Sequence, residues 1–237
     1  MDPAIPPSID GLQAYIDPGN TPRVVLSGAD VDSVSSVVGS DVYANTLTNR
    51  PTYSLTALIG RPGLNFARAS SQLLRDATSD AAAQVSGNGA FSLYLAVSLT
   101  ADATAQQFLN LHNDTGNNYC GIGITAANNL LFFRGAGGVT NDNIVGTALT
   151  TGLRIISVVY SGASVNAWVN SVLNINAAGA PSSVAAIASM SYGSGRYGGA
   201  TSQPMQGSGG KALLFAGAHS TAQRQAHEAW LRSFYQV

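Results

Sequence analysis

Charged side chains are scarce in this sequence. Asp, Glu, Lys and Arg make up 10% of its 237 residues, against about a quarter in an average globular protein. Lys211 and Glu228 are the only lysine and the only glutamate, the arginines are scattered, and the formal net charge is -1. Proteins that bind nucleic acids or anionic membranes need clustered basic side chains. We therefore expect no nucleic-acid partner and no attachment to an anionic membrane.

Cysteine, signal-peptide features and long apolar runs are also rare or missing. Cys120 is the only cysteine, so no disulfide can form within the chain. The opening MDPAIPPSID has neither the basic nor the apolar region of a secretory signal peptide. No apolar run reaches the length of a membrane span. These features predict a protein made and folded in a reducing cytoplasm, without a signal peptide and without membrane insertion.

Short apolar runs that alternate with polar residues are abundant. In FSLYLAVSL (91–99), apolar side chains alternate with Ser, Tyr and Ala, which is typical of a half-buried strand. LRIISVVYS (153–161) is apolar on both faces and is expected to be a central strand. Further strand-like runs, separated by Asn- and Gly-rich turns, cover 12–18, 31–38, 105–112, 119–125, 129–134, 165–170 and 211–219. This spacing predicts an all-β sandwich.

We expect one domain, residues 12–237, preceded by an extended arm. Residues 1–11 carry prolines at positions 3, 6 and 7, which prevent a helix and remove backbone donors. Ile5, Pro6, Pro7 and Ile9 form the apolar part of this arm, which is expected to contact another subunit.

A helix is expected at about residues 220–235. Ser220 and Gln223 have the spacing of a capping box. Ala222, Ala226, Trp230 and Phe234 then recur at helical intervals and predict a buried stripe, with Trp230 and Phe234 as anchors. Arg224, Glu228 and Arg232 fall four residues apart on another stripe, which is expected to be a solvated row of ion pairs.

The order of several short motifs resembles a known family. The motifs are the strand at 12–17, NRPTY (49–53), GRPGLNF (60–66) followed by Leu73, VNAWVN (165–170) and STAQRQAHEAWL (220–231). In this order they resemble the laminin G-like jelly-roll domains of the concanavalin A-like lectin/glucanase superfamily, most of all those of phage virion and bacterial surface proteins. The chain departs from that pattern in SSVVGSDVYA, which has no tryptophan, and in Ser171, where the family has glycine.

The resemblance implies a concanavalin A-like jelly-roll β-sandwich of two antiparallel sheets with a short C-terminal helix. It does not fix the function, because this fold hosts lectins, hydrolases, lyases and passive structural domains. A glucanase of the superfamily uses a strand with two glutamates as nucleophile and acid/base. One glutamate on a terminal helix cannot supply this pair, and Asp30 and Asp32 are expected in a solvated turn. We therefore expect no catalytic residues and no enzyme activity.

Calcium and glycans remain as ligands to consider. Asn113, Asp114 and Asn117 in HNDTGNN could ligate Ca²⁺, but one carboxylate is few for that ion. Asx turns that cap a hairpin are favoured, so no cofactor is expected. Tyr192, Arg196 and Tyr197 in SYGSGRYGG could stack on and hydrogen-bond a sugar. The other possibility is a glycine-rich crossover whose tyrosines pack locally.

These observations predict a non-enzymatic phage virion protein, either a head decoration or cement protein or a tail-associated component. Its expected partners are other capsid or tail proteins, reached through the arm, and further copies of itself in a homo-oligomer. The alternative is a lectin-like carbohydrate-binding module that acts as a host adhesin and binds a surface glycan.

Overall fold

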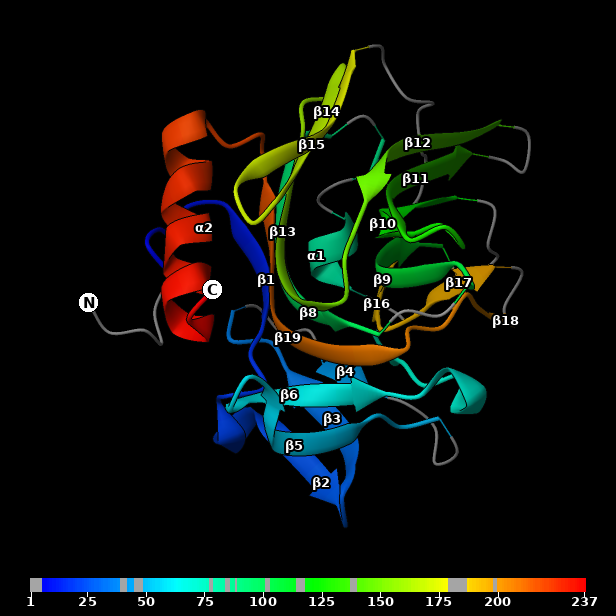
Figure 1. The fold of residues 1–237 in the computed structure, drawn as a ribbon, viewed down its shortest axis with the longest axis vertical. Helices are drawn as coiled ribbons and strands as arrows, with labels where there is room; N and C mark the ends of the chain where they lie inside the picture. The colour runs from blue at the N-terminus through cyan, green and yellow to red at the C-terminus, as the bar shows by residue number, and fades with distance from the viewer. Residues whose placement is uncertain are drawn as a thin grey trace.

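The computed structural model describes most of the chain. The described residues are 6–38, 42–44, 49–76, 79–83, 86–87, 89–100, 103–113, 118–136, 140–178, 187–197 and 200–237. They form a β-sandwich of two antiparallel sheets, with one long helix packed on an outer face (Figure 1). The prediction of an all-β jelly roll with a C-terminal helix is confirmed. No helix within these ranges is long and apolar enough to cross a membrane.

The first sheet is built around the strand at residues 91–99, which is paired with a neighbour on each side. All its pairings are antiparallel. At one end of this sheet, the strands at residues 12–16 and 61–66 pair with successive parts of the same edge of the strand at residues 207–216. From edge to edge the strands are β15 (Val172–Ala178), β14 (Ser164–Val169), β13 (Gly152–Tyr160), β8 (Phe91–Leu99), β19 (Gly207–Ala216), β1 (Leu12–Ile16) and β6 (Arg61–Phe66).

The second sheet faces the first, and short helical segments join the strands. β5 (Thr52–Leu58) links the two sheets, because it pairs along β6 and at one position with β3. The second sheet runs through β12 (Thr140–Ala148), β11 (Asn129–Ala136), β10 (Tyr119–Ile124), β9 (Gln106–His112), β16 (Ser189–Tyr192), β7 (Leu74–Asp76), β4 (Val42–Ala44), β3 (Asp30–Ser35) and β2 (Val24–Ser27). The remaining elements are the β17 (Gly195–Tyr197) and β18 (Ala200–Ser202) hairpin, η1 (Thr21–Arg23), η2 (Arg68–Ser70), α1 (Asp80–Ala83) and α2 (Thr221–Tyr235).

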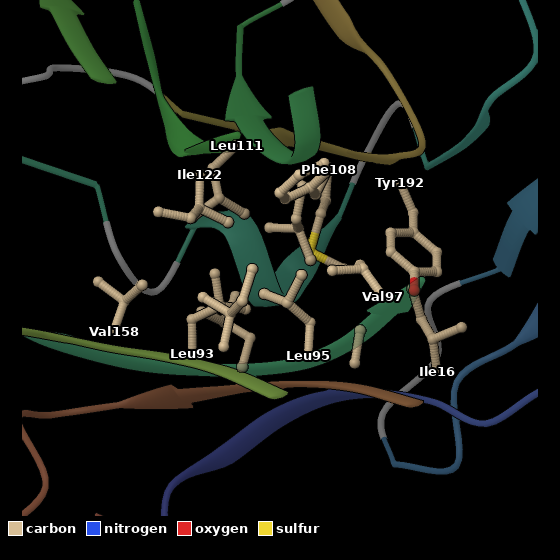
Figure 2. Close-up of a cluster of buried hydrophobic side chains, with 14 of the residues drawn as sticks. Ile16, Leu93, Leu95, Val97, Phe108, Leu111, Ile122, Val158 and Tyr192 are labelled. Atoms are coloured by element: carbon tan, nitrogen blue, oxygen red, sulfur yellow. The ribbon is translucent and has the colours of Figure 1, made fainter. Parts of the chain in front are cut away.

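The main hydrophobic core lies between the two sheets. Alternate side chains of β8, which are Leu93, Leu95 and Val97, point from the first sheet toward Phe108 and Ile122 of the second (Figure 2). All five are at most 2% exposed. Period-two alternation places one set of side chains on this face, so the sequence pattern was sufficient to identify it.

The opposite face of β8 is also buried, which corrects the prediction of a half-buried strand. Tyr94 and Ala96 are fully buried in a second cluster with Trp230 and Leu231 of α2. In Figure 1, α2 lies alongside the outer surface of the β8, β13 and β19 sheet. Polar groups on this face of β8 have partners in the segment between β19 and α2. The Ser92 hydroxyl donates to the Gly217 carbonyl at 3.0 Å, and the Tyr94 hydroxyl lies 2.8 Å from His219 Nδ1.

The face that α2 buries is the second correction. Ser220 and Gln223 form the predicted capping box, and Trp230 is buried as expected, with Phe234 half-buried. However, Ala222, Ala226 and Ala229 are exposed. The buried residues of the helix are Arg224, His227, Glu228, Trp230, Leu231 and Tyr235.

Glu228 is therefore not a solvated residue. It is 1% exposed, forms an ion pair of 2.5 Å with Arg224, and accepts a hydrogen bond from the Ser157 hydroxyl of β13. The Arg224 guanidinium carbon lies 4.1 Å from the centroid of the Trp168 ring. The sheet beneath the helix offers a hydroxyl and an aromatic face, so it can bury an ion pair that a purely apolar surface could not.

A glycine pair in β19 lets two tyrosines approach the strand backbone. A Cβ on Gly209 would lie 2.3 Å from the Tyr192 hydroxyl, and a Cβ on Gly210 would lie 2.2 Å from the Tyr235 hydroxyl. Tyr192 donates a hydrogen bond to the Gly210 carbonyl, and the Lys211 amide donates one to the Tyr235 oxygen. These contacts explain why β19 begins with glycines that the sequence pattern had placed outside the strand.

The edge strands of the two sheets meet at Asn174. Its side-chain oxygen accepts a hydrogen bond from the Thr147 amide at 3.0 Å, and its nitrogen donates to the Thr147 hydroxyl at 2.6 Å. Asn174 lies on β15, which is paired with β14, and Thr147 lies on β12, which is paired with β11; neither strand has a second ladder within the described residues. The side-chain amide thus joins two strand edges that have no backbone ladder between them.

The described part of the N-terminal arm lies against its own domain. Pro6 is buried, the Ser8 carbonyl lies 3.3 Å from His227 Nε2, and the Gly11 carbonyl accepts from the Ala216 amide at 2.8 Å. Pro7 and Ile9 are exposed, and Ile5 lies outside the described residues. Contact of the arm with another subunit stays a prediction.

We expect His219 to make the stability of the domain depend on pH. Burial, and then the neighbouring His227, lower the pKa of His219 from 6.5 to about 4. The Tyr94 hydroxyl lies 2.8 Å from His219 Nδ1. The unfolded chain therefore binds a proton that the folded chain does not, so this contribution is present above pH 6.5 and is lost as the pH falls toward 4.

The measurement is the melting temperature of the wild type and of His219→Gln between pH 7 and pH 4. The melting temperature of the wild type should fall further over this interval than that of the variant, because glutamine does not titrate and still offers an acceptor to Tyr94. An equal fall in melting temperature in the two proteins would show that His219 is not the source of the pH dependence.

Candidate ligand-binding groove

The structure separates the residues that the sequence suggested for glycan binding. Tyr192 is 0% exposed and points into the core, where its ring meets Phe66 edge to face at 5.5 Å (Figure 2). It cannot stack on a sugar, so this part of the prediction is wrong. Arg196 and Tyr197 are on β17, and their side chains lie outside the described part of the structure.

The loop considered for calcium is only partly described. The Asn113 side-chain oxygen accepts a hydrogen bond from the Asn118 amide at 3.1 Å, as expected of a side chain that caps a hairpin. Asp114 and Asn117 lie outside the described residues. Among the residues that are described, no group of three or more His, Cys, Asp or Glu side chains is placed to hold a metal ion. Calcium binding stays untested.

Asp30 and Asp32 lie on β3 rather than in a solvated turn. Asp32 forms an ion pair with Arg50, and the Asp30 position pairs with Thr52 of β5. The aspartates are thus part of the contact between β3 and the segment that leads into β5. This contact gives them a structural role.

A groove of about 340 Å³ lies where the β5–β6 hairpin meets the start of β19. Its volume falls at the lower end of the range for small-molecule sites. Among the described residues that line it, all polar side chains are amides or hydroxyls and none is charged. The lining residues are Thr52, Asn65, Phe66, Ala67, Gln72, Thr100, Gln206, Gly207 and Ser208.

Two close contacts with backbone carbonyl groups fix the shape of this groove. Gly207 has φ +143°, and a Cβ there would lie 2.2 Å from the Ser98 carbonyl oxygen, so only glycine lets β19 approach β8 this closely. The Arg68 guanidinium donates to the carbonyls of Ala105 and Thr104 at 3.4 and 3.5 Å. The η2 turn is thereby held against the segment that leads into β9.

The amide side chains in the groove are held by their oxygen atoms. Gln72 Oε1 accepts a hydrogen bond from the Ala67 amide at 2.6 Å, and Gln206 Oε1 accepts one from the Arg68 amide at 3.0 Å. A backbone N–H can only donate, so these contacts identify the oxygen end of each amide. The NH2 ends of Gln72 and Gln206 have no protein partner within the described residues.

A third amide behaves in the same way. The Ser208 hydroxyl donates to Asn65 Oδ1 at 2.7 Å, which leaves the Asn65 NH2 group available. Phe66 is 2% exposed and forms an apolar wall rather than an open stacking platform. The groove therefore presents hydrogen-bond donors at fixed positions on an uncharged surface, together with the hydroxyls of Thr52 and Thr100.

No pattern in the sequence pointed to this groove. Its described residues come from β5, β6, the positions on either side of η2 and one end of the β8–β19 pairing, and they span more than a hundred positions of the sequence. Single Gln and Asn residues between strands are expected in any loop. Only the pairing of β6 with the first residues of β19 brings Asn65 beside Ser208.

No family model and no curated protein matches the sequence. Solved structures do match the fold. Domain 4 of AbnA, a GH43 extracellular arabinanase from Geobacillus stearothermophilus in complex with arabinotriose, is 17% identical, covers 91% of this chain and 98% of its own, and has a TM-score of 0.54.

Two sialidase structures give similar matches. The CBM40 carbohydrate-binding module of a Ruminococcus gnavus IT-sialidase, bound to α2,3-sialyllactose, is 14% identical, covers 60% of this chain and 81% of its own, and has a TM-score of 0.50. The NanB sialidase of Streptococcus pneumoniae is 16% identical over 65% of this chain, with a TM-score of 0.53. The match covers 26% of NanB, about a quarter of that enzyme. At these identities the comparisons establish the fold alone: this chain is a lectin-like jelly-roll β-sandwich of the kind found in carbohydrate-binding modules.

Proposed function

We propose that this chain is a carbohydrate-binding module and that the groove between the β5–β6 hairpin and the start of β19 is its glycan site. The observation that carries the proposal is the set of anchored amides, because Gln72 and Gln206 present NH2 donors whose oxygen ends are held by backbone N–H groups. The fold supports it as well. Two modules with similar folds were solved with sialyllactose and with arabinotriose.

Anchored donors suit a sugar for an energetic reason. A glutamine side chain that is free in solution loses rotamer entropy when a ligand orders it, and this loss weakens binding. Here the hydrogen bonds to the Ala67 and Arg68 amides have already ordered both side chains. The donors then meet hydroxyl or carbonyl oxygens of a glycan at a smaller entropic cost.

The chemistry of the groove favours binding over catalysis. Glycoside hydrolysis needs a pair of carboxyl groups that flank the scissile bond. The described residues that line the groove offer amides and hydroxyls instead. We therefore propose a non-enzymatic, lectin-like role, which is the alternative that the sequence left open.

The test replaces the donors without removing the anchors. Gln72→Glu and Gln206→Glu keep an oxygen for the backbone N–H groups but exchange each NH2 for an oxygen. A lost hydrogen bond costs about 0.5–1.5 kcal/mol, so each variant should bind a glycan-array hit about two- to tenfold more weakly in calorimetry, and the double variant more weakly still.

Gln225→Glu on the exposed face of α2 is the matched control and should bind as the wild type does. Melting temperatures of the variants check that the fold is intact. Unchanged affinity in the Gln72→Glu, Gln206→Glu double variant would rule out the groove as the glycan site. If no glycan on the array bound the wild type, the proposed function itself would be wrong.

The virion location, the capsid or tail partners and the homo-oligomer stay predictions, since each concerns an assembly beyond a single chain. A module that binds surface glycans would fit a phage adhesin as well as other settings. A protein census of purified phage particles would decide between them.

A further inference from the structure

A second pocket, of about 360 Å³, lies between the segment that follows β1 and the C-terminal end of α2. Its floor contains the only lysine of the chain. Exposed residues of η1 form its rim, and a phenylalanine of α2 forms one wall. The lining residues are Tyr15, Asp17, Gly19, Asn20, Thr21, Pro22, Val37, Lys211 and Phe234.

The floor of this pocket is a hydrogen-bonded triad. Lys211 Nζ lies 2.5 Å from Asp17 Oδ2 and 2.8 Å from the Tyr15 hydroxyl, which donates to Asp17 Oδ2 at 3.0 Å. The Gly19 amide donates to Asp17 Oδ1 at 2.9 Å. Burial, and then the charge of Asp17, raise the pKa of Tyr15, so this hydroxyl stays protonated.

The triad leaves one donor and one acceptor unused. An ammonium group has three N–H donors, and Lys211 uses two of them on Asp17 and Tyr15. A carboxylate has about four acceptor positions, and Asp17 receives three donors. Asp17 Oδ2 accepts from both Lys211 and Tyr15, and Oδ1 accepts from Gly19 alone, so the remaining lone pair is on Oδ1. The remaining N–H belongs to Lys211 Nζ, which lies 2.5 Å from the other oxygen of the same carboxylate.

The charge balance of the floor selects against charged ligands. Lys211 and Asp17 neutralise each other, so an added anion would face the Asp17 carboxylate and an added cation the Lys211 ammonium. Coulombic repulsion at this range is strong where water is largely excluded. A hydroxyl group both accepts and donates, so it can take the free N–H and the free lone pair together without adding charge.

The wall adds an apolar surface next to this polar floor. The Lys211 nitrogen lies 4.4 Å from the centroid of the Phe234 ring and 5.2 Å from that of Tyr15. An aromatic wall beside a hydroxyl-binding group matches molecules that carry both C–H and O–H groups on one small frame.

We propose that this pocket is a second ligand site, separate from the groove, and that it binds a neutral polyhydroxyl compound through one hydroxyl held between Lys211 and Asp17. The ligand class is a monosaccharide unit or a small polyol. The site does not depend on the groove, since the two share none of the lining residues that the structure describes.

The single lysine makes the test direct. Protein grown with 13C-labelled lysine gives one set of lysine side-chain signals, and all of them come from Lys211. Glycerol, methyl glucoside and methyl galactoside are titrated as neutral probes, and sodium acetate as an anion. At least one neutral probe should shift the Lys211 Cε signal saturably in the millimolar range, whereas acetate should not.

Two variants block the pocket without removing the triad. Gly19→Leu places a side chain in the pocket, since its Cβ would lie 3.1 Å from Asp17 Oδ1 and 3.9 Å from Phe234 Cζ. Thr21→Trp fills the mouth from an exposed residue and leaves the core packing alone. Both should abolish the shift. Thr221→Trp, the same change at an exposed residue of α2, should preserve it.

Three outcomes would overturn the proposal. They are the absence of a saturable shift with every neutral probe, an acetate shift as large as the polyol shift, and a polyol shift that survives in both Gly19→Leu and Thr21→Trp. The groove is tested separately, because Gln72→Glu should leave the Lys211 response unchanged even if the groove binds no glycan.

Discussion

Replacing Glu228 by alanine should lower the free energy of unfolding by about 3–5 kcal/mol, the usual cost of removing one partner of a buried ion pair. Glu228 is 1% exposed, and its loss leaves the Arg224 guanidinium, itself 6% exposed, without its carboxylate. The Ser157 hydroxyl loses its acceptor as well. The measurement is chemical denaturation of the wild type and the variant.

Two further variants show that the cost comes from the buried charge. Gln225→Ala, on the exposed face of the same helix, should change stability by no more than about 0.5 kcal/mol. The double variant Arg224→Met, Glu228→Leu removes both charges and should recover much of the loss, because apolar pairs often replace buried ion pairs without penalty. A loss of only a few tenths of a kcal/mol for Glu228→Ala would mean that the helix face is solvated.

Replacing Trp230 by alanine should cost about 3–5 kcal/mol, as for other buried tryptophans. The side chain is 6% exposed and belongs to the cluster beneath α2, where its ring meets Tyr15 edge to face at 6.2 Å. Its removal opens a cavity between the helix and the outer face of the first sheet. The same denaturation measurement applies.

The other predicted anchor of the helix provides the comparison. Phe234 is only half-buried, with Arg61 5.1 Å from its ring centroid on one side. Phe234→Ala should therefore cost clearly less than Trp230→Ala. Equal costs would indicate that the two rings contribute alike to docking of the helix.

Nine of the 19 described strands were predicted from the sequence, several of them because their side chains alternate. The run at 91–99 was placed to the residue, and the central position of β13 followed from its apolar character on both faces. Alternation does not say what covers the outer face of a strand. The burial of Tyr94 under α2 depends on a helix more than a hundred residues later in the chain.

The face of α2 was predicted wrongly for a related reason. Hydrophobicity assigns alanines to the buried side and charged residues to solvent, but Ala222 and Ala226 are small and lose little when exposed. Arg224 and Glu228 can be buried because each neutralises the other and Ser157 and Trp168 accommodate them. Partners on another element cannot be read from the periodicity of the helix alone.

The groove was beyond prediction because its chemistry depends on the direction of side-chain amides. The sequence shows that Gln72 and Gln206 exist but not that their oxygens bind backbone N–H groups. The glycine-rich tyrosine segment looked more like a sugar site, yet its Tyr192 fills the core, since Gly209 leaves room for the phenol.

The link between Asn174 and Thr147 bears on how the protein avoids self-association. Free strand edges invite pairing with other chains, and many proteins guard them with charged side chains. β15 carries no charged residue and exposes Val172 and Leu173. The Asn174 amide instead ties this edge to β12 of the same molecule and accepts from the Thr147 N–H. We therefore expect this contact, rather than electrostatic repulsion, to hinder pairing of the edge with another chain.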